Sequence, residues 1–392
     1  MTFSLRGLVE VVAAAGTICC LAFYTLATIA LVSFLRWRKK NSARAAAQAQ
    51  WPAVSILKPL KGVDPEIWES FCSHCEQDYP EFELIFGVND ADDPACDVVR
   101  RLQQAYPNMP VRLLVCDQVL GANRKVSNLA QMAKAARYDV LVVNDSDIRV
   151  ARDYLKRIVA PLADSGVGLV TCLYRGVPAT TLGSRLEALG IGTDFALGVL
   201  SARFLEGGIR FGLGSTLAFR RGDLAASGGF EALTDYLADD YELGRRIAAK
   251  GKRVELSGTT VATFLPAYSF AEFWQHQLRW ARTIRDARRG GYVGLLFTFG
   301  LPWALAALIA SRGAGWAWAL FAMTLLLRVI AGSGAALAAL RDQCAVKNAW
   351  LFPLRDLIAP LVWFGGLFGN RIHWRGDAFV LRDGKLTRVD AV

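Results

Sequence analysis

The sequence predicts an α/β domain with a mainly parallel sheet, flanked at both ends by apolar segments long enough to cross a membrane. Strongly apolar stretches lie at residues 1–35 and 291–370, whereas residues 36–289 mix polar and apolar side chains as water-soluble domains do. Within that middle part, short apolar runs alternate with amphipathic stretches of helical length, which is typical of domains that alternate strands and helices. The 392 residues leave room for one such domain and several membrane segments.

The first apolar run, residues 7–35, contains a single charged residue, Glu10, and exceeds the roughly 20 residues that span a hydrocarbon core. A cleaved signal peptide is the alternative, but its apolar stretch is normally about 7 to 15 residues and precedes a small-residue cleavage site. Here the run ends in Arg-Trp-Arg-Lys-Lys at residues 36–40. Such basic clusters stay on the cytosolic side, so residues 1–40 are predicted to be an anchor followed by a cytosolic domain.

After a polar linker at residues 41–50, continuous apolar runs predict buried strands. These lie at residues 53–59, 83–88, 111–116 and 139–143, with helices between them at 65–78, 94–106 and 125–136. Strands that are apolar throughout, rather than alternating, are typical of a parallel sheet covered by helices on both faces. A further strand is predicted at 167–172, before a glycine-rich passage at 206–215.

Polar residues gather where these strands end. Lys58 closes the first strand, Asn89 and Asp90 follow the second, and Asp145 and Asp147 follow the strand at 139–143. Ligands of open α/β sheets bind outside the carboxyl ends of the strands, so this edge is predicted to carry the site. Mg²⁺ is commonly held by one or two carboxylates plus substrate phosphates, which makes Asp145 and Asp147 candidate metal ligands. Loop capping by the same side chains is the alternative for such a pair.

A second acidic pair, Asp239 and Asp240, opens a predicted helix. Asp239 is expected to be its N-cap, with Glu242 completing a capping box. Asp240 in the first turn is a candidate general base, because a helix N-terminus favours the ionised carboxylate that accepts a proton.

A basic helix is predicted at residues 275–289, where Arg282, Arg285 and Arg289 share one face and Trp280 pairs with Ile284. The net charge of +10 is concentrated here and at residues 36–40. An anionic lipid surface explains that placement better than nucleic acid, because no nucleic-acid module is recognisable.

The remaining apolar stretches are predicted as membrane segments. Residues 292–310 and 317–339 are expected to span, whereas 350–368 contains two charges and two prolines and is expected to form a bent, re-entrant or interfacial hairpin. Residues 184–204 are predicted to be too polar to span and are assigned to the interface. The predicted division is an anchor at 1–40, a catalytic domain at 51–270, an interfacial helix at 271–290, membrane segments at 291–370 and a cytosolic tail at 371–392.

Taken together, the motifs resemble glycosyltransferases of the GT-A fold, a Rossmann-like α/β domain, and in particular the ceramide glucosyltransferase family, glycosyltransferase family 21. The resemblance covers nearly the whole chain. It rests on the motifs at residues 58–65 (Lys-Pro-Leu-Lys-Gly-Val-Asp-Pro), 90–94 (Asp-Ala-Asp-Asp-Pro), 121–129, 145–150, 238–241 and 374–376 (Trp-Arg-Gly).

This resemblance implies an inverting, UDP-sugar-dependent hexosyltransferase. Asp90 would contact the uracil or ribose, Lys125 would lie nearby on the nucleotide, and Asp145 would serve both the donor and the metal. Asp145 and Asp147 would hold Mg²⁺ or Mn²⁺ against the diphosphate. Asp240 would take the proton of the acceptor hydroxyl.

The family's basic motif, Gln or Arg followed after two residues by Arg-Trp, is matched by Arg279 and Trp280, which would brace the diphosphate and the acceptor. His276 stands at its first position, where it can still donate a hydrogen bond to phosphate. Similar bacterial proteins are thought to glycosylate a hopanoid, so the resemblance leaves two lipid acceptors open. These are ceramide with UDP-glucose and bacteriohopanetetrol with UDP-N-acetylglucosamine.

The Ala- and Arg-rich composition favours a bacterial inner membrane as the location. A processive polysaccharide synthase shares the aspartates and the Arg-Trp motif, but it needs a channel that two or three C-terminal segments are too few to build. A catalytically dead, lipid-binding anchor protein is the alternative from another class, and the presence of all the carboxylates argues against it.

Overall fold

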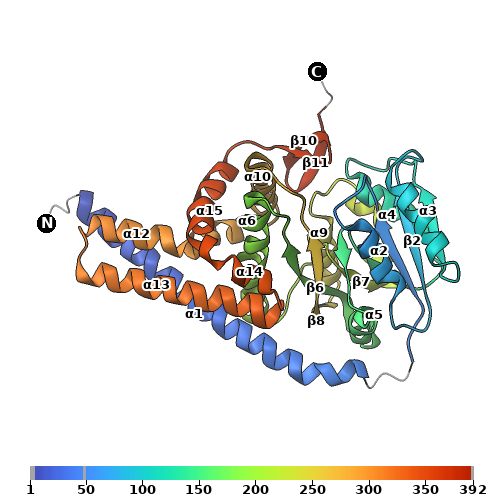
Figure 1. Ribbon diagram of the computed structural model, residues 1–392, viewed down its shortest axis with the longest axis horizontal. Coiled ribbons are helices and arrows are strands. Elements are labelled where there is room, and N and C mark those ends of the chain that lie inside the picture. Colours follow the sequence, from blue (N-terminus) through green and yellow to red (C-terminus); the bar gives the residue numbers. More distant parts are fainter. Residues whose placement is uncertain (1–4, 47–49, 390–392) are drawn as a thin grey trace. The chain divides into compact units, whose positions relative to one another are not determined.

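The computed structural model describes residues 5–46 and 50–389 and divides into two compact units (Figure 1). The helical unit comprises Met1–Arg36, Thr180–Leu205 and Ala267–Asn370. The sheet unit comprises Trp37–Ala179, Glu206–Pro266 and Arg371–Val392. Each unit therefore collects segments that lie far apart in the sequence, and each is described by itself.

The sheet unit is built on an 8-stranded sheet in the order β3-β2-β1-β4-β7-β6-β8-β5. The strands are β1 Val54–Pro59, β2 Phe82–Val88, β3 Val111–Val115, β4 Val140–Val143, β5 Ile148–Arg149, β6 Val167–Val177, β7 Leu217–Arg220 and β8 Arg253–Phe264. The predicted strands are thus confirmed. The four strands β3, β2, β1 and β4 run parallel, as their apolar runs indicate.

The other half of the sheet is mixed. Strand β7 runs antiparallel to both β4 and β6, β6 pairs with β8 in parallel, and β5 is antiparallel to β8. The expectation of a mainly parallel sheet is confirmed, because six of its eight strands point the same way and β7 and β5 are the two reversed ones. The apolar runs of β1 to β4 predicted that these strands are parallel. The directions of the strands in the second half follow from chain connections that no local pattern encodes.

Helices cover both faces of the parallel half. They are α2 Ile67–Cys75, α3 Ala95–Ala105, α4 Arg124–Ala135 and α5 Tyr154–Val159, and the rest of the unit adds α8 Arg221–Ala226 and α9 Asp239–Ala249. Side chains of α2, α3 and α5 share one core with alternate residues of β1, β2 and β4. On the opposite face α4 contacts β1 and β2, where a Cβ on Gly87 would lie 2.4 Å from the Met132 sulfur. Strands β1, β2 and β4 are buried along their whole length, which explains why they are largely apolar instead of alternating.

The predicted C-terminal tail is instead a three-stranded antiparallel sheet of β9 Arg371–Trp374, β10 Asp377–Arg382 and β11 Lys385–Arg388, in the order β11-β10-β9. Its apolar side chains alternate along the strands and pack with Leu237 in a small core. Two-residue turns with positive φ connect the strands, at Arg375-Gly376 and Asp383-Gly384. Such turns match the twist of a hairpin, so the segment folds as part of the sheet unit.

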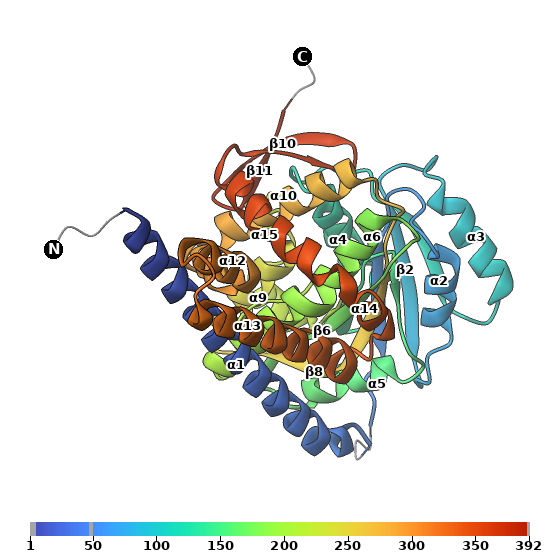
Figure 2. The same cartoon turned by 60° about the vertical axis from the view of Figure 1, so that its left-hand side comes forward.

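The helical unit gathers helices from three segments that lie far apart in the sequence (Figure 2). They are α1 Leu5–Ala46, α6 Leu182–Gly190, α7 Ala196–Leu205, α10 Phe270–Ala287, α11 Arg289–Gly294, α12 Gly300–Ala310, α13 Gly315–Gly334, α14 Gln343–Lys347 and α15 Phe352–Leu367. Helix α1 continues into the predicted linker as far as Ala46, and residues 47–49 of that linker lie outside the described residues. Figures 1 and 2 place α1 alongside α12 and α13, and Cys20, Tyr24 and Ala27 of α1 pack with Ala331 of α13.

Within the described residues, three helices are long and apolar enough to cross a membrane: Leu5–Asn41, Leu182–Leu205 and Gly315–Ala339. The second joins α6 and α7 through a π-helical stretch, Ile191–Phe195, and overturns the expectation that this segment is too polar to span. The predicted span at 292–310 is a pair of helical segments, Arg289–Thr298 and Gly300–Ala310, bent by 53°. Phe299 interrupts the helix between them with a ψ of 61°.

The predicted hairpin at 350–368 is wrong, because α15 is a single helix that contains Pro360. Its charges are neutralised inside the unit. Asp356 accepts from Arg328 of α13 at 2.8 Å, and Arg328 also reaches Asp194 at 2.6 Å. Arg355 lies 3.3 Å from Asp194. Paired and buried charges of this kind are tolerated among membrane helices, so Asp194 and Arg328 do not exclude Leu182–Leu205 and Gly315–Ala339 as candidate spans.

Candidate active site

The loop after β4 carries Asp145 and Asp147 at the carboxyl end of the strand. Asn144 anchors this loop, since its side-chain amide donates to the Tyr154 hydroxyl at 2.8 Å and to the Ser215 carbonyl at 2.7 Å. The buried Lys58 ammonium donates to the backbone carbonyl of Asp145 at 2.9 Å. Burial lowers the pKa of Lys58 to about 7, against the opposing effect of Asp147 and Asp145. The loop is therefore held from β1 as well as from its own strand.

Lys125 bridges the two acidic pairs. Its ammonium lies 2.7 Å from the Asp145 carboxylate and 3.7 Å from that of Asp239. Asn123 positions this side chain by capping α4, where its side-chain oxygen accepts from the Val126 N–H at 3.2 Å. Burial acts to lower the pKa of Lys125, but the carboxylates of Asp145 and Asp239 outweigh burial and raise it. Lys125 is thus a permanent cation among the carboxylates.

Asp239 and Asp240 occupy the first turn of α9. The N-cap is Ala238, and Glu242 pairs with Arg245 at 2.7 Å, so the predicted capping box at Asp239 is wrong. Burial, followed by the neighbouring Asp239, raises the pKa of Asp240 to about 6. Lys125 and the Tyr241 N–H, which donates to Asp240 at 2.7 Å, oppose that rise.

The helix terminus was expected to favour ionised Asp240, and the structure corrects this expectation. Burial beside a second carboxylate has the larger effect on its pKa. A pKa near neutrality suits a general base, because the group accepts a proton at working pH and binds it firmly enough to be effective.

Gly214 lines the space between the acidic pairs. A Cβ built on it would lie 3.2 Å from the Asp240 Oδ2 and 3.5 Å from the Asp145 Oδ2. Both oxygens therefore face one small volume that only a residue without a side chain leaves open. The turn is fixed by Leu213, whose N–H donates to the Thr171 hydroxyl at 2.9 Å.

The donor set fits a hard divalent cation that also binds a diphosphate. Asp145 uses its Oδ1 for Lys125, which leaves Oδ2 facing the Gly214 space. Asp147 accepts from the Thr263 hydroxyl through one oxygen only. Burial and the neighbouring Asp145 raise the pKa of Asp147 to about 6, as expected of crowded carboxylates. Two carboxylates complete a Mg²⁺ or Mn²⁺ shell only together with phosphate oxygens and water.

Asp90 lies exposed in the loop after β2, at the same edge of the sheet as Asp145. Its Oδ1 accepts from the Asp92 N–H at 3.0 Å, so this hydrogen bond stays within the loop. The predicted position at the strand end is confirmed. A contact of Asp90 with a nucleotide stays a prediction.

The residues of the basic motif belong to the helical unit. Helix α10 begins with a capping box formed by Ser269 and Glu272, a sequence signal that places its start before the predicted residue 275. His276 lies 3.1 Å from the Glu187 carboxylate of α6. Its ring also lies 5.6 Å from that of Trp280, centre to centre. His276 thus lies against a carboxylate of its own unit.

The basic face of α10 binds the end of α15. Arg285 donates to the carbonyls of Gly366 at 2.7 Å and Gly369 at 3.0 Å, and Arg282 donates to that of Phe368 at 3.1 Å. Arg289 begins α11 and so does not share a helix with the other two, contrary to the predicted face. Cations at a helix C-terminus stabilise its unpaired carbonyls, which is a structural role for Arg282 and Arg285.

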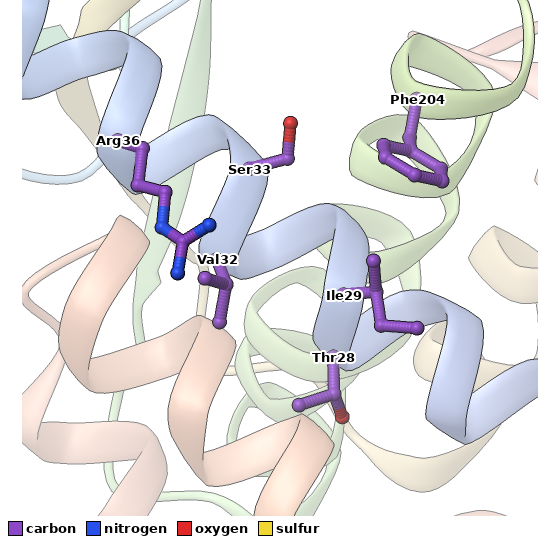
Figure 3. A pocket seen from close by; sticks show the side chains of 6 residues that line it. All are labelled: Thr28, Ile29, Val32, Ser33, Arg36 and Phe204. Carbon is purple, nitrogen blue, oxygen red and sulfur yellow. The ribbon is translucent and has the colours of Figure 1, made fainter.

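An open groove of about 470 Å³ lies between α1 and α7 within the helical unit (Figure 3). It is lined by Thr28, Ile29, Val32, Ser33, Arg36 and Phe204. Its apolar side chains face the groove along the helices and Arg36 supplies a cation at one end. A second hollow, of about 420 Å³, is lined by Phe270, Ala271, Trp274 and Gln275 of α10.

The profile of glycosyl transferase family 21 matches residues 17–387. The chain belongs to this family. Similar proteins include ceramide glucosyltransferase 3 of Caenorhabditis elegans, which is 26% identical over 272 residues, covering 69% of this chain and 58% of the relative. The ceramide glucosyltransferase of Komagataella phaffii is 36% identical over 140 residues, covering 34% of this chain and 28% of the relative.

The chain spans about half the length of the first of these family 21 relatives, 58% and 49% for two nematode proteins. Among solved structures, the mannosyltransferase PcManGT of Pyrobaculum calidifontis, in complex with GDP-Man and Mn²⁺, is similar over 89% of this chain and 97% of its own, with a TM-score of 0.50 and 21% identity. The fold of the chain is accordingly that of GT-A glycosyltransferases. The predicted bacterial inner membrane finds no support in these relatives, since the similar sequences named here come from a nematode and a yeast.

Proposed function

We propose that this family 21 chain is an inverting glycosyltransferase that moves a hexose from a UDP-sugar to the hydroxyl of a membrane lipid. The observation that carries this proposal is the small volume at Gly214, which faces Asp240 on one side and Asp145 with its partner Lys125 on the other. A candidate proton acceptor, Asp240, thus lies across one small space from Asp145 and Lys125, the groups that would bind the metal ion and the phosphates. That combination is what a single-displacement transfer from a nucleotide sugar requires.

In this reaction Asp240 takes the proton of the acceptor hydroxyl as that oxygen attacks the anomeric carbon. The bond from this carbon to the diphosphate oxygen breaks, UDP leaves with the electron pair, and the configuration inverts. The raised pKa of Asp240, about 6, leaves the side chain ionised at neutral pH and ready to accept the proton.

The cationic side of the site serves the leaving diphosphate. Lys125 is held as a cation by two carboxylates and offers its ammonium to the phosphate oxygens. Asp145 and Asp147 would hold Mg²⁺ or Mn²⁺, which neutralises charge on the departing diphosphate. Asp90, which follows β2 at the same edge of the sheet, serves the uracil or ribose. The roles of His276, Arg279 and Trp280 at the diphosphate and acceptor stay predictions that rest on the family motif.

A ceramide acceptor and a glucose donor are favoured by the names of the similar proteins, which are ceramide glucosyltransferases. The candidate membrane helices would keep the enzyme where a lipid hydroxyl is available. The basic cluster at residues 36–40 supports a cytosolic face for the site, where UDP-sugars are available.

The test is direct product identification. The full-length protein in detergent micelles is incubated with Mn²⁺, either UDP-glucose or UDP-N-acetylglucosamine, and either ceramide or bacteriohopanetetrol, and the lipids are analysed by mass. We expect hexosylceramide from UDP-glucose. An N-acetylglucosaminyl hopanoid would identify bacteriohopanetetrol as the acceptor instead of ceramide. Polymer formed without lipid would favour a polysaccharide synthase. Failure of every pairing to give a glycosylated product would overturn the proposal.

A further inference from the structure

The turn between β9 and β10 places a cationic side chain beside the loop after β1. Arg375 and Gly376 form this two-residue turn with φ values of 51° and 87°. Left-handed values at both positions are those of the type I′ turn, which continues the twist of a hairpin. A non-glycine residue pays a conformational cost there, so the position of Arg375 is set by the surrounding structure.

Arg375 and the loop at residues 61–64 hold each other by reciprocal contacts. The guanidinium pairs with both oxygens of Asp64, at 3.0 and 3.3 Å, and donates to the Lys61 carbonyl at 3.2 Å. The Lys61 ammonium in turn donates to the Arg375 carbonyl and lies 3.3 Å from Asp377. A fork-shaped pair of this kind fixes the direction of both side chains, which a single contact does not.

The chain of contacts continues into the site. The Oδ2 of Asp64 also accepts from the hydroxyl of Ser146, a residue with 2% exposure that lies between Asp145 and Asp147. Two hydrogen-bonded steps therefore connect Arg375 to the loop with the candidate metal ligands. Burial acts to lower the pKa of Arg375, yet Asp64 and, more weakly, Asp145 and Asp147 raise it, as expected for a cation close to all three carboxylates.

The same small sheet also holds the approach to the other acidic pair. The Leu237 N–H donates to the Gly384 carbonyl at 3.0 Å, and the Leu386 N–H donates to the Asp235 carbonyl at 2.7 Å. Helix α9 begins at Asp239, two residues after Leu237. The C-terminal sheet thus contacts segments that lead to both sides of the Gly214 space.

We propose that Arg375 is a positioning residue of the donor site, which acts through Asp64 and Ser146 to fix the loop of Asp145 and Asp147. This inference rests on the proposed function for what the site binds, but the fixing of the loop is independent of it. The competing explanation is that Arg375 only stabilises the hairpin. In that case its loss would affect the hairpin and leave the loop after β4 unchanged.

The experiment compares Arg375→Gln with Arg388→Gln in the full-length protein. Arg388 is a matched control, because it also pairs with a carboxylate of the same sheet, Asp377, at 2.6 Å. Hydrogen–deuterium exchange is followed in peptides that contain residues 144–149. UDP affinity is measured by calorimetry with Mn²⁺ present. Outer contacts that orient metal ligands typically contribute about 10- to 100-fold in affinity, so we expect roughly a tenfold weaker UDP affinity.

We expect Arg375→Gln to speed exchange at residues 144–149, and Arg388→Gln to leave exchange and affinity as in the wild type. Asp64→Asn should reproduce the Arg375→Gln effect, and the double variant should be no worse than either single one, because all three break one path. Unchanged exchange at 144–149 in Arg375→Gln would overturn the proposal, as would additive losses in the double variant. If the wild type transfers no sugar, the proposed function fails while the exchange measurement still decides the positioning role.

Discussion

Replacing Gly214 by alanine is expected to block the site without unfolding the protein. The added methyl group would lie 3.2 Å from the Asp240 Oδ2 and 3.5 Å from the Asp145 Oδ2. The first distance is tight for a carbon and an oxygen, so Asp240 has to give way by a few tenths of an ångström. The second is an ordinary contact, so the carboxylates remain close to their places.

The effect on transfer is large because the methyl group occupies the volume that both carboxylates face. An acceptor hydroxyl must approach a carboxylate oxygen to about 2.5 to 3.0 Å, and the methyl carbon competes for that place. A displacement of about 1 Å can cost on the order of a hundredfold in rate, which is the loss of kcat/KM expected here. The backbone of Gly214 is not in the left-handed region, so alanine fits it without strain and lowers the conformational entropy of the unfolded chain. The free energy of unfolding is therefore expected to stay unchanged or to rise by up to about 1 kcal/mol.

The assay measures kcat/KM for sugar transfer with the donor and acceptor that the product analysis identifies, together with UDP affinity and the thermal midpoint of Gly214→Ala. Gly208→Ala is the control, because a Cβ at Gly208 meets nothing within 4 Å and its backbone is also outside the left-handed region. We expect the control to retain full turnover. Wild-type kcat/KM in Gly214→Ala would refute the placement of the reaction between Asp240 and Asp145, whereas a lowered thermal midpoint would refute the packing argument.

Three further predictions concern the charges of the site. Asp240→Asn should lower kcat by roughly 10²- to 10⁴-fold while UDP affinity, measured by calorimetry, stays within about twofold. Because the folded pKa of Asp240, about 6, lies above the unfolded value of about 3.9, its stabilising contribution is present below pH ~3.9 and is lost as the pH rises through about 6. The same variant should therefore raise the free energy of unfolding at pH 7.5 by about 1 to 3 kcal/mol, and an unchanged value in denaturant titration would contradict the buried carboxylate. The turnover of the wild type should fall about tenfold per pH unit below pH 6 in a pH–rate profile, and a flat profile down to pH 5 would exclude Asp240 as the base. Lys125→Met should weaken UDP affinity and lower the free energy of unfolding by roughly 1 to 3 kcal/mol, since it leaves Asp145 and Asp239 without their cation; unchanged UDP binding would remove Lys125 from the donor site.

The parallel half of the sheet could be predicted from the sequence because its information is local. Strands such as Val54–Pro59 and Phe82–Val88 are largely apolar and buried on both faces, and each is separated from the next by an amphipathic helix. The position of Asp90 and Asp145 at one edge followed directly, since parallel strands end on the same side. The helix that begins with Asp239 was also found, although its cap was not, because Ala238 leaves no side-chain signal.

The membrane segments were predicted less well, because their polarity has to be judged together with distant partners. Asp194, Arg355 and Asp356 argued for bends or interfacial positions when they were considered alone. Arg328 on another helix pairs with both of the aspartates, at 2.6 and 2.8 Å. Because the charges are paired, they no longer argue against a position inside the membrane. No local pattern identifies these pairs, because the partners lie on different helices and far apart in the sequence.

The sequence by itself determined the α/β class, the apolar helices and the acidic residues at the strand ends, since each of these features depends on residues that are close together in the sequence. Only the tertiary structure decided which groups meet. It placed Lys125 between Asp145 and Asp239, left a side-chain-free space at Gly214, and folded the supposed tail so that Arg375 reaches Asp64. The physical reason is that these contacts join segments brought together by sheet pairing and burial, and the pKa values that suit the chemistry arise from those contacts.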